Sequence, residues 1–322
     1  MVEAAQLVSK VLVLDDDPAA TQRIKAFCDD NNLVGVKTQS ASVMSVLRSN
    51  VDLGAIFLSE TYRNDGEDAL AFAREIHTIR PELPVFLRRE AFSRLDDLSE
   101  RDQTLFSKAY TLNDIEALVP VLSETIFSLV YPNGLVRGIT EITKAALESQ
   151  FKGVEVHTEA PYIVRDRIIF GELFTLIPLE SNWCRGYMML QTEEKPLIGF
   201  VERDKTHIVT DAVNFRDINH VLGEVTNLVW GSFKNRYIAF EPLEGRQSQV
   251  PIIVNHLHRY ISFGSEDPQL CFKYMLTDTD GGGPSLVIYQ RFVFNLSWAP
   301  EKFKENEAVA EDLFDSGELE LF

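Results

Sequence analysis

The first 128 residues alternate short apolar runs with segments whose apolar residues recur every three or four positions, such as Ala20, Ile24, Phe27 and Cys28. Short apolar runs are typical of buried strands, and the longer period is typical of helices. Strands that alternate with helices predict a parallel sheet wound with helices on both faces. We therefore expect an α/β doubly wound (βα)5 domain with strands at Lys10–Leu14, Leu33–Thr38, Ala55–Leu58, Pro84–Leu87 and Leu105–Ser107.

The pattern changes after Ser128, where the sequence LVYPNGLVRG places the turn formers Pro132, Asn133 and Gly134 in a row. Helical segments and longer alternating strands follow, which indicates an α+β domain. We expect a first domain over 1–128, a linker over 129–135, a second domain over 136–299 and an acidic, flexible tail over 300–322. The second domain has predicted helices at Ile139–Phe151 and Asp211–Asn235, and predicted strands at Tyr162–Phe170, Leu173–Leu179, Gly186–Gln191, Leu197–Glu202, Tyr237–Glu241, Leu270–Thr277 and Leu286–Phe294.

Charge and cysteine content narrow the class of protein. The 49 acidic and 31 basic residues give a formal charge of −18, which disfavours binding to nucleic acid or to anionic lipid. Cys28, Cys184 and Cys271 are odd in number and far apart, so they predict neither a disulfide framework nor a zinc site. The N-terminus does not resemble an export signal, and no apolar run approaches roughly 18 residues. We expect a cytoplasmic protein.

Two acidic residues close the first predicted strand, and a lysine follows the fifth. With Asp15, Asp16 and Lys108 at these places, residues 10–128 resemble the CheY-like receiver domains of bacterial response regulators. The resemblance implies that the aspartates correspond to the Mg²⁺ site and that Lys108 corresponds to the lysine that pairs with the phosphoryl group. Ala109 departs from the proline that usually follows this lysine.

Two departures indicate a degenerate receiver. Ser59 takes the place of the phospho-accepting aspartate, and Arg89 the place of a threonine or serine that contacts the phosphoryl oxygen. A serine hydroxyl cannot form an acyl phosphate, and Mg²⁺ loses an oxygen ligand. We predict no phosphorylation by the usual route. Three alternatives stay open: Glu60 as a built-in phosphate mimic paired with Arg89, phosphorylation of Ser59, or an aspartate pair that merely ends a strand.

The segment DAVNFRDINHVLGEVTNLVWGSFKN predicts a long helix with two different faces. At 100° per residue one face is apolar and must pack on the sheet. The opposite side carries a stripe that contains an asparagine and a glycine, although glycine costs about 1 kcal/mol relative to alanine within a helix. Helicity alone does not explain these residues. The apolar face comprises Ile218, Val221, Leu222, Val225, Leu228, Val229 and Phe233, and the stripe comprises His220, Glu224, Asn227 and Gly231.

The pattern Glu224-x-x-Asn227, followed by Gly231 and Lys234, is similar to the signature helix of the CheC/CheX family of aspartyl-phosphate phosphatases. Only one such helix is found, so CheX is the closer relative, and the resemblance covers about Leu135–Phe294. The expected architecture is therefore a degenerate receiver domain followed by an α+β CheX-like domain. A helix with a merely solvated polar face is the alternative.

The CheX resemblance implies a role for each residue of the stripe. Asn227 would orient the attacking water, Glu224 would pair with the active-site lysine of a partner receiver, and Gly231 and His220 would mark where the partner approaches. The expected substrate is phospho-Asp on another CheY-like receiver of a two-component or chemotaxis pathway, because Ser59 denies the chain a substrate of its own. This chain would bind no cofactor, and Mg²⁺ is expected in the partner's site.

Other assemblies and functions stay open at this point. The CheX-like halves of two chains can pair as a homodimer. The rival to a phosphatase is a non-catalytic adaptor that binds or sequesters signalling partners.

The weaker features concern the C-terminal residues and possible metal ligands. Asp312, Leu313 and Phe314 lie in a segment similar to the peptide with which the unrelated phosphatase CheZ docks onto CheY, so we expect a docking tail, with a solubilising tail as the alternative. His256 and His258 alternate on a predicted strand, but we expect no metal there. The sequence DTDGGGP, which begins at Asp278, predicts a hairpin turn rather than a calcium loop.

Overall fold

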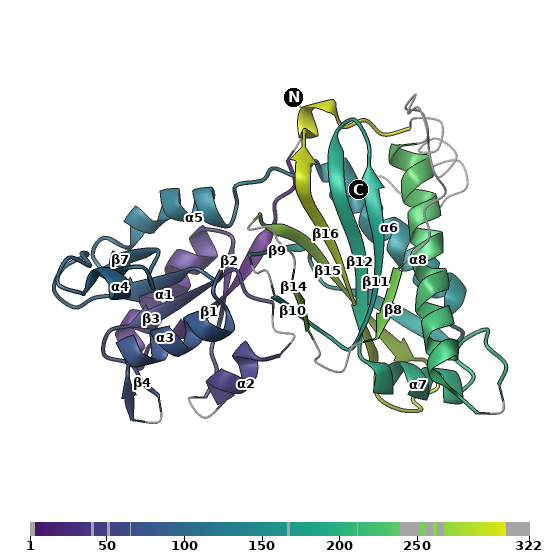
Figure 1. Ribbon diagram of the computed structural model, residues 1–322, viewed down its shortest axis with the longest axis horizontal. Helices are drawn as coiled ribbons and strands as arrows, with labels where there is room; N and C mark the ends of the chain where they lie inside the picture. The colour runs from purple at the N-terminus through teal and green to yellow at the C-terminus, as the bar shows by residue number, and fades with distance from the viewer. Residues whose placement is uncertain are drawn as a thin grey trace.

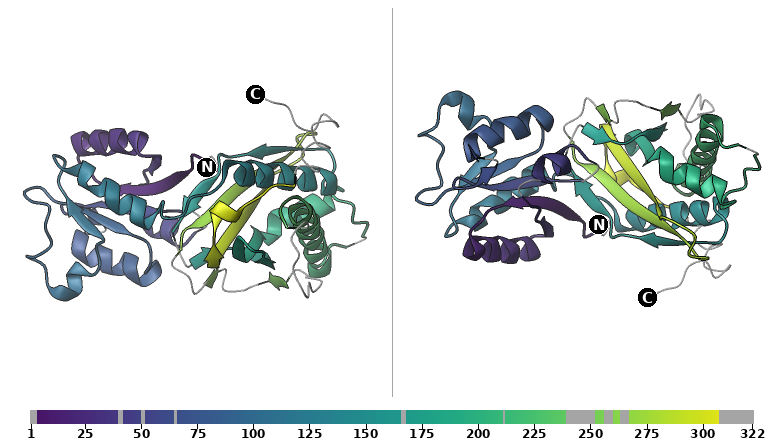
Figure 2. Two further views of the ribbon diagram at one scale, coloured as in Figure 1. Left: turned by 90° about the horizontal axis from the view of Figure 1, so that it is seen from above. Right: turned by 90° about the horizontal axis from the view of Figure 1, so that it is seen from below.

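The computed structural model describes residues 4–39, 42–49, 52–64, 66–165, 168–210, 212–238, 252–255, 260–262 and 267–306. The N-terminal half is a parallel sheet with helices on both faces (Figures 1 and 2). Its elements are β1 (Val8–Leu14), α1 (Pro18–Asp30), β2 (Leu33–Val36), α2 (Val43–Leu47), β3 (Ala55–Ser59), β4 (Arg63–Asn64), β5 (Glu67–Asp68), α3 (Ala69–Ile79), β6 (Val85–Arg88), α4 (Glu100–Gln103), β7 (Lys108–Tyr110), the 3-10 helix η2 (Ile115–Leu118) and α5 (Val119–Thr125).

Alternation along β1 explains why helices cover both faces. Val11 and Val13 pack in the core with α1 and α5, whereas Leu12 and Leu14 pack on the other side with α2 and α3. Both faces of the strand are therefore buried, as a near-continuous apolar run predicts. The strands lie in the order β2-β1-β3-β6-β7, all parallel.

The predicted α/β class is confirmed, but the fifth strand and the fourth crossover differ from the expectation. The fifth strand was expected at Leu105–Ser107, whereas β7 begins at Lys108. Phe106 is buried in the core as a loop residue, so the apolar run reflects loop packing rather than a strand. The crossover between β6 and β7 contains only the single turn α4, so the (βα)5 cycle is irregular there.

The C-terminal half is an antiparallel sheet with two long helices. The predicted α+β organisation of this half agrees with the observed elements. They are α6 (Asn133–Gln150), β8 (Val154–Thr158), β9 (Tyr162–Val164), β10 (Ile168–Phe170), β11 (Leu173–Glu180), β12 (Cys184–Thr192), α7 (Glu194–Glu202), α8 (Phe215–Tyr237), β13 (Ile252–Asn255), β14 (Tyr260–Ser262), β15 (Gln269–Asp278), β16 (Leu286–Trp298) and the 3-10 helix η3 (Pro300–Lys302).

Several boundaries in this half differ from the sequence prediction. The predicted strand Tyr162–Phe170 is two strands, β9 and β10, which belong to different sheets. The segment Leu197–Glu202 is not a strand but lies in α7, whose Leu197, Phe200 and Val201 are buried at helical spacing. Helix α6 begins at Asn133, inside the predicted linker, with Pro132 at the N-cap. Proline is tolerated at the start of a helix, because the first N–H groups have no acceptor within the helix and the N–H that proline lacks is not missed there. Tyr237 ends α8 instead of starting a strand.

The two halves share one sheet, which sequence patterns did not predict. β1 pairs in parallel with β9 through Val8 with Tyr162 and Ser9 with Ile163. β9 pairs with β15, so the sheet runs β13-β11-β12-β16-β15-β9-β1-β3-β6-β7, with β2 added on β1 and β8 on β15. The Ser9 hydroxyl also donates to the carbonyl of Ile163 at 2.7 Å.

The first residues of the predicted tail are packed rather than free. Phe303 packs against Trp183 and Tyr237, with ring centroids 5.2 and 5.4 Å apart. The backbone N–H of Asn306 donates to the carbonyl of Arg236 in the last turn of α8 at 2.9 Å. The predicted flexible tail over 300–322 is therefore wrong for residues 300–306. The docking residues Asp312, Leu313 and Phe314, like His256 and His258, lie outside the described residues.

Candidate functional site

Helix α8 owes its position to its ends and to its apolar face. Asn214 caps the N-terminus and forms a capping box with Asp217, which satisfies N–H groups that the helix leaves unpaired. The buried face packs into the core of the C-terminal half, against strands of the sheet and α6. Its members between the first and last turns are Ile218, Val221, Leu222, Gly223, Val225, Thr226, Val229 and Phe233.

The predicted polar stripe lies on the opposite side of α8. His220 and Asn227 are exposed, and Glu224 and Gly231 are partly exposed. Within the described part of the chain, the side chains of Glu224 and Asn227 make no hydrogen bond or ion pair. A carboxylate and a carboxamide, one turn apart, are therefore available to a binding partner.

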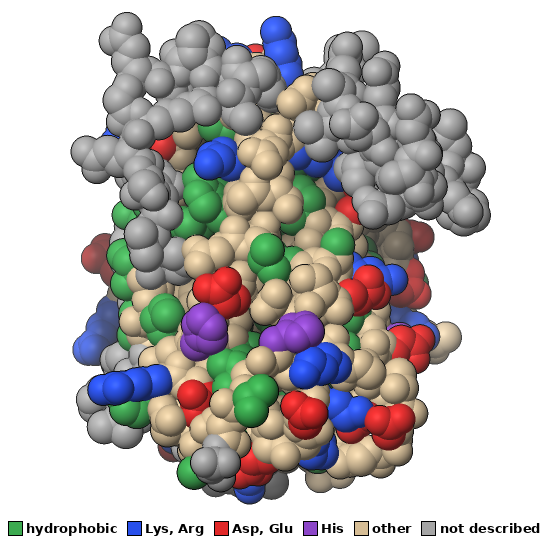
Figure 3. Space-filling model, turned by 90° about the vertical axis from the view of Figure 1, so that its right-hand side faces the viewer, with side chains coloured by type: hydrophobic (Ala, Val, Ile, Leu, Met, Phe, Trp, Pro, Cys, Tyr) green, Lys and Arg blue, Asp and Glu red, His purple; other side chains and the backbone are tan. Residues whose placement is uncertain are grey.

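Gly231 leaves an open place at the end of this stripe. A Cβ added to Gly231 meets no atom within 4 Å, so packing within the described residues does not require a glycine there. Figure 3 looks at the side of the molecule that carries α8, where acidic, basic and apolar side chains are mixed and no large single-sign patch forms on the described surface.

The prediction that Leu228 belongs to the buried apolar face is wrong. Leu228 is 38% exposed, whereas its neighbour Val229 is buried. The exposed side of α8 therefore extends from the stripe of His220, Glu224, Asn227 and Gly231 to Leu228.

The C-terminal end of α8 is fixed by a buried arginine. Arg236 forms ion pairs with Glu305 at 2.5 Å and with Glu141 of α6 at 2.7 Å, and its side chain is 2% exposed. Burial by itself lowers the pKa of Arg236, but Tyr237, Glu141 and Glu305 together raise it. The helix that carries the stripe is therefore anchored to α6 and to residues 300–306.

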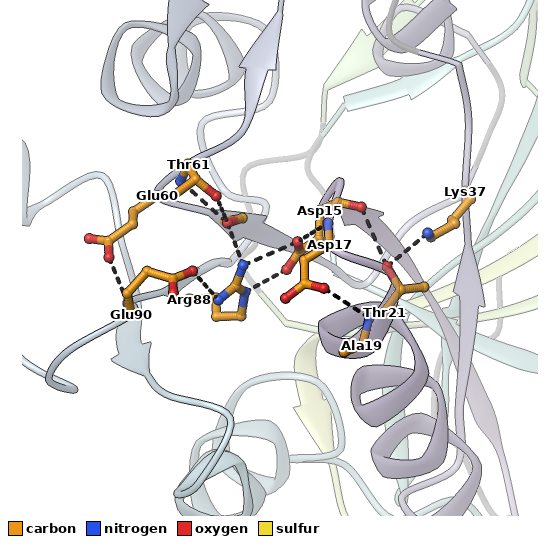
Figure 4. A network of polar contacts seen from close by, with 10 residues as sticks. Asp15, Asp17, Ala19, Thr21, Lys37, Glu60, Thr61, Arg88 and Glu90 are labelled. Atoms are coloured by element: carbon orange, nitrogen blue, oxygen red, sulfur yellow. Dashed lines mark hydrogen bonds and ion pairs between the residues drawn. The ribbon is translucent and has the colours of Figure 1, made fainter.

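The site expected in the N-terminal half is occupied by an arginine that the sequence analysis missed. Arg88, the last residue of β6, forms an ion pair with Asp15 at 2.5 Å and donates to the Ser59 hydroxyl at 2.9 Å and to Glu90 at 2.7 Å (Figure 4). The side chains of Arg88 and Asp15 are 3% and 1% exposed. Burial alone lowers the pKa of Arg88, but the hydrogen bonds to Asp15 and Glu90 raise it above its usual value.

A second arginine organises the loop after β6. Arg89 forms ion pairs with Glu60 at 2.5 Å and with Asp97 at 2.7 Å, and the hydrogen bond to Asp97 is the main cause that raises its pKa. Glu60 also accepts a hydrogen bond from the backbone N–H of Glu90 at 2.6 Å. The Glu60–Arg89 ion pair that accompanied the phosphate-mimic alternative is therefore present.

The remaining residues predicted for the receiver site are not brought together. Asp16 is exposed, whereas Asp15 is buried. Lys108 begins β7 instead of following a strand, and its ammonium group donates to the carbonyl of Ala117 at 2.8 Å. The cluster thus joins Asp15, Ser59 and Arg88, without Lys108.

A pair of adjacent arginines at the end of a buried strand was the signal for Arg88. Arg88 and Arg89 follow PVFL, and alternation along a strand sends two successive side chains to opposite faces. Only one of them can approach Asp15. Sequence alone did not reveal which arginine this is, because the last residue of the strand could not be identified from the sequence.

One further ion pair lies at a hairpin of the C-terminal half. Asp278 pairs with Lys205 at 2.7 Å, and the hydrogen bond from Lys205 lowers the pKa of Asp278 in the hairpin between β15 and β16. No group of three or more His, Cys, Asp or Glu residues in the described ranges is arranged to hold a metal ion. None of the described helices is long and apolar enough to cross a membrane.

Comparison with solved structures finds two kinds of neighbour. The chemotaxis protein CheX from Desulfovibrio desulfuricans is 13% identical, with a TM-score of 0.37, and the match covers 49% of this chain and 99% of that one. CheX from Vibrio vulnificus is 20% identical, with a TM-score of 0.33, over 48% of this chain and 99% of that one. A CheY-like receiver domain protein from Methanospirillum hungatei is 12% identical, with a TM-score of 0.30, over 36% of this chain and 95% of that one.

The neighbours divide along the chain. CheX/CheC-like proteins cover the C-terminal half, and CheY-like receivers cover the N-terminal part. No protein-family model and no curated protein matches the sequence.

Proposed function

We propose that the protein hydrolyses phospho-Asp on a partner receiver in two-component or chemotaxis-type signalling. The observation that carries the proposal is the stripe on α8, which presents Glu224, Asn227 and Gly231 together without a partner in the described part of the chain. The similarity of this helix to the CheC/CheX signature supports the same function.

The chemistry asks little of the phosphatase. An aspartyl phosphate in a receiver already lies beside a metal ion and a lysine, so the second protein need only place a water molecule in line with the phosphorus. The Asn227 carboxamide can accept a hydrogen bond from water and donate one, and it is not a strong base. A carboxamide that projects into solvent from a rigid helix suits this positioning role.

Glu224 and Gly231 would govern how the partner docks. Glu224 lies one turn before Asn227 and offers a carboxylate to a cation such as the partner's lysine. Gly231 lies one turn after Asn227, where the absence of a side chain lets a partner backbone approach the helix closely. Mg²⁺ would belong to the partner's site and not to this chain.

The chain's own receiver-like half is not the proposed substrate. Arg88 already neutralises Asp15 and donates to Ser59, so a cation and a phosphoryl group would have to displace a buried guanidinium. Helix α8 also lies on the side of the molecule away from the N-terminal half (Figure 1). The reaction is therefore proposed to occur between two proteins.

The test is hydrolysis of phosphorylated receivers by three variants. CheY-like receivers are phosphorylated with acetyl phosphate and the loss of the acyl phosphate is followed. Asn227→Ala and Glu224→Ala should each slow hydrolysis by about a hundredfold, because positioning carries the rate. Asn235→Ala removes the same amide from an exposed position of α8 about two turns beyond Asn227, past the last residue of the stripe, and should leave the rate unchanged.

The rival function is a non-catalytic adaptor that binds receivers through the same surface. An adaptor would bind phosphorylated receivers without accelerating the loss of phosphate. Equal hydrolysis by the protein and by both stripe variants would reject the phosphatase proposal.

A further inference from the structure

The middle of α8 is held to the sheet by one polar contact in an otherwise apolar interface. The structure describes every residue of this helix. Among its buried residues from Ile218 to Phe233, the only one with a polar side chain is Thr226. Its hydroxyl oxygen lies 2.6 Å from that of Thr175 in β11, and both side chains are fully buried.

The direction of these hydrogen bonds follows from counting protons. The Thr226 hydroxyl donates to the carbonyl of Leu222 at 2.7 Å, which uses its only proton. The Thr175 hydroxyl must therefore donate to Thr226. Two hydroxyls thus connect the strand to the helix backbone at Leu222, one turn before Thr226.

This contact restrains a rotation that apolar packing alone would favour. Hydrophobic burial is non-directional, so it does not by itself fix the rotation of a helix on a sheet. Thr226 and Leu228 lie about 160° apart around the axis, on opposite flanks of the buried face. A rotation that buried the exposed part of Leu228 would separate Thr226 from Thr175 and leave a buried hydroxyl without a partner.

We infer that Thr175 and Thr226 are positioning residues that fix the rotation of α8 and so hold Asn227 and Glu224 in the direction of a bound receiver. The inference rests on the proposed function. Asn227 directly follows Thr226, so any rotation of the helix moves its carboxamide. A shift of about 1 Å in a positioning group can cost roughly a hundredfold in rate.

The kinetic test uses variants that remove the hydroxyls without leaving a buried donor unpaired. Thr175→Val alone leaves Thr226 bonded to Leu222, and the double variant Thr175→Val/Thr226→Val removes both hydroxyls. The double variant should lower kcat by about tenfold to a hundredfold with KM changed less than about twofold. Its urea midpoint should stay close to that of the parent, since two apolar groups of similar shape replace the pair.

Two further variants separate positioning from general damage to the core. Thr143→Val removes a buried hydroxyl from α6 that donates to Gln290 of β16 at 3.0 Å. It is a matched change that leaves the Thr175–Thr226 contact intact, so it should leave kcat unchanged. Thr226→Ser retains the hydroxyl and should keep most of kcat. An unchanged kcat in the double variant, or equal losses in Thr143→Val, would overturn the inference.

A second measurement does not depend on activity. Nitroxide labels are placed together at Asn227→Cys and Lys144→Cys in one chain, in samples that are kept apart from the kinetic assays. The natural cysteines are all buried and should not take up the label. The label-to-label distance distribution should be narrow in the parent and with Thr143→Val, and broader or shifted with Thr175→Val/Thr226→Val.

The two readouts distinguish the possible failures. An unchanged distance distribution in the double variant contradicts the positioning role. If the parent does not hydrolyse any receiver phosphate, the proposed function fails, and the distances alone decide whether the threonine pair sets the orientation of residue 227.

Discussion

At the residue scale, charged side chains decide what each half can do. In the N-terminal half, the guanidinium of Arg88 compensates the charge of the buried Asp15 carboxylate. This carboxylate therefore needs no metal ion to balance its charge. A buried ion pair of this kind depends on both partners. We expect the cluster to hold one arrangement rather than to switch with added Mg²⁺ or phosphodonor.

Gly231 provides a prediction that separates stability from function. Gly231→Ala should raise the free energy of unfolding by about 0.5–1 kcal/mol, because alanine favours the helix and the added methyl group has open space. The same methyl group should hinder a partner backbone and raise KM for a phosphorylated receiver. Urea denaturation and hydrolysis assays measure the two effects. A variant with higher stability and an unaltered KM would show that the partner does not approach at this residue.

At the element scale, the position of α8 depends on segments far away in the sequence. Its N-terminus is capped locally, but its C-terminal end is fixed by α6 and by residues 300–306 through Arg236, Glu305 and Phe303. The first residues of the acidic segment, 300–306, thus complete the fold.

Two truncations test this division. A chain that ends at Ala299 should lose roughly 2–4 kcal/mol of unfolding free energy, because Phe303 is removed from its aromatic neighbours and the buried Arg236 loses Glu305. A chain that ends at Asn306 should unfold at the same urea concentration as the full chain. Equal loss in both truncations would contradict a packed segment that ends near Asn306.

At the scale of the whole molecule, the halves are joined by a continuous sheet and by buried charges. Asp52 of the N-terminal half accepts hydrogen bonds from Tyr162 and Arg291 of the C-terminal half, and all three side chains are buried. Removal of one partner would leave a buried charge uncompensated. The shared strands and this cluster favour a single unfolding transition over two independent ones.

A second junction gives a pH-dependent prediction. Glu159 pairs with Lys10 of β1 at 3.4 Å and with Lys273 of β15. Burial acts to raise the pKa of Glu159, but the two lysines together lower this pKa below its usual value. A lowered pKa in the folded state stabilises the protein above the unfolded pKa of about 4.3. This contribution is lost as the pH falls through the folded pKa.

The variant that checks this junction is Glu159→Gln. Between about pH 6 and pH 3 the parent should lose more unfolding free energy than Glu159→Gln, which lacks the titrating group. Urea midpoints measured across this range provide the comparison, and the two proteins should converge at the acid end. Parallel pH profiles would show that Glu159 does not couple the halves. Added salt should reduce the difference, because Glu159 is half exposed.

The sequence by itself determined the features that depend on local periodicity. Apolar alternation located β1, β3 and the long antiparallel strands β11, β12, β15 and β16, but it missed β8, β13 and β14. The period of α8 placed Glu224, Asn227 and Gly231 on one side of the helix, and the structure leaves that side at least partly exposed. The same reasoning failed where loop packing imitates a strand, as at Phe106, and where a short apolar segment suits either structure, as at Leu197–Glu202.

Only the tertiary structure decided which residues meet across the chain. Arg88 rather than Lys108 reaches Asp15, β1 pairs with β9, and Thr175 meets Thr226 beneath the exposed stripe. Each of these contacts joins residues that are distant in the sequence and depends on strand register to within one residue. Local patterns fix which face of an element is buried, but register and helix rotation follow from long-range packing and hydrogen bonds.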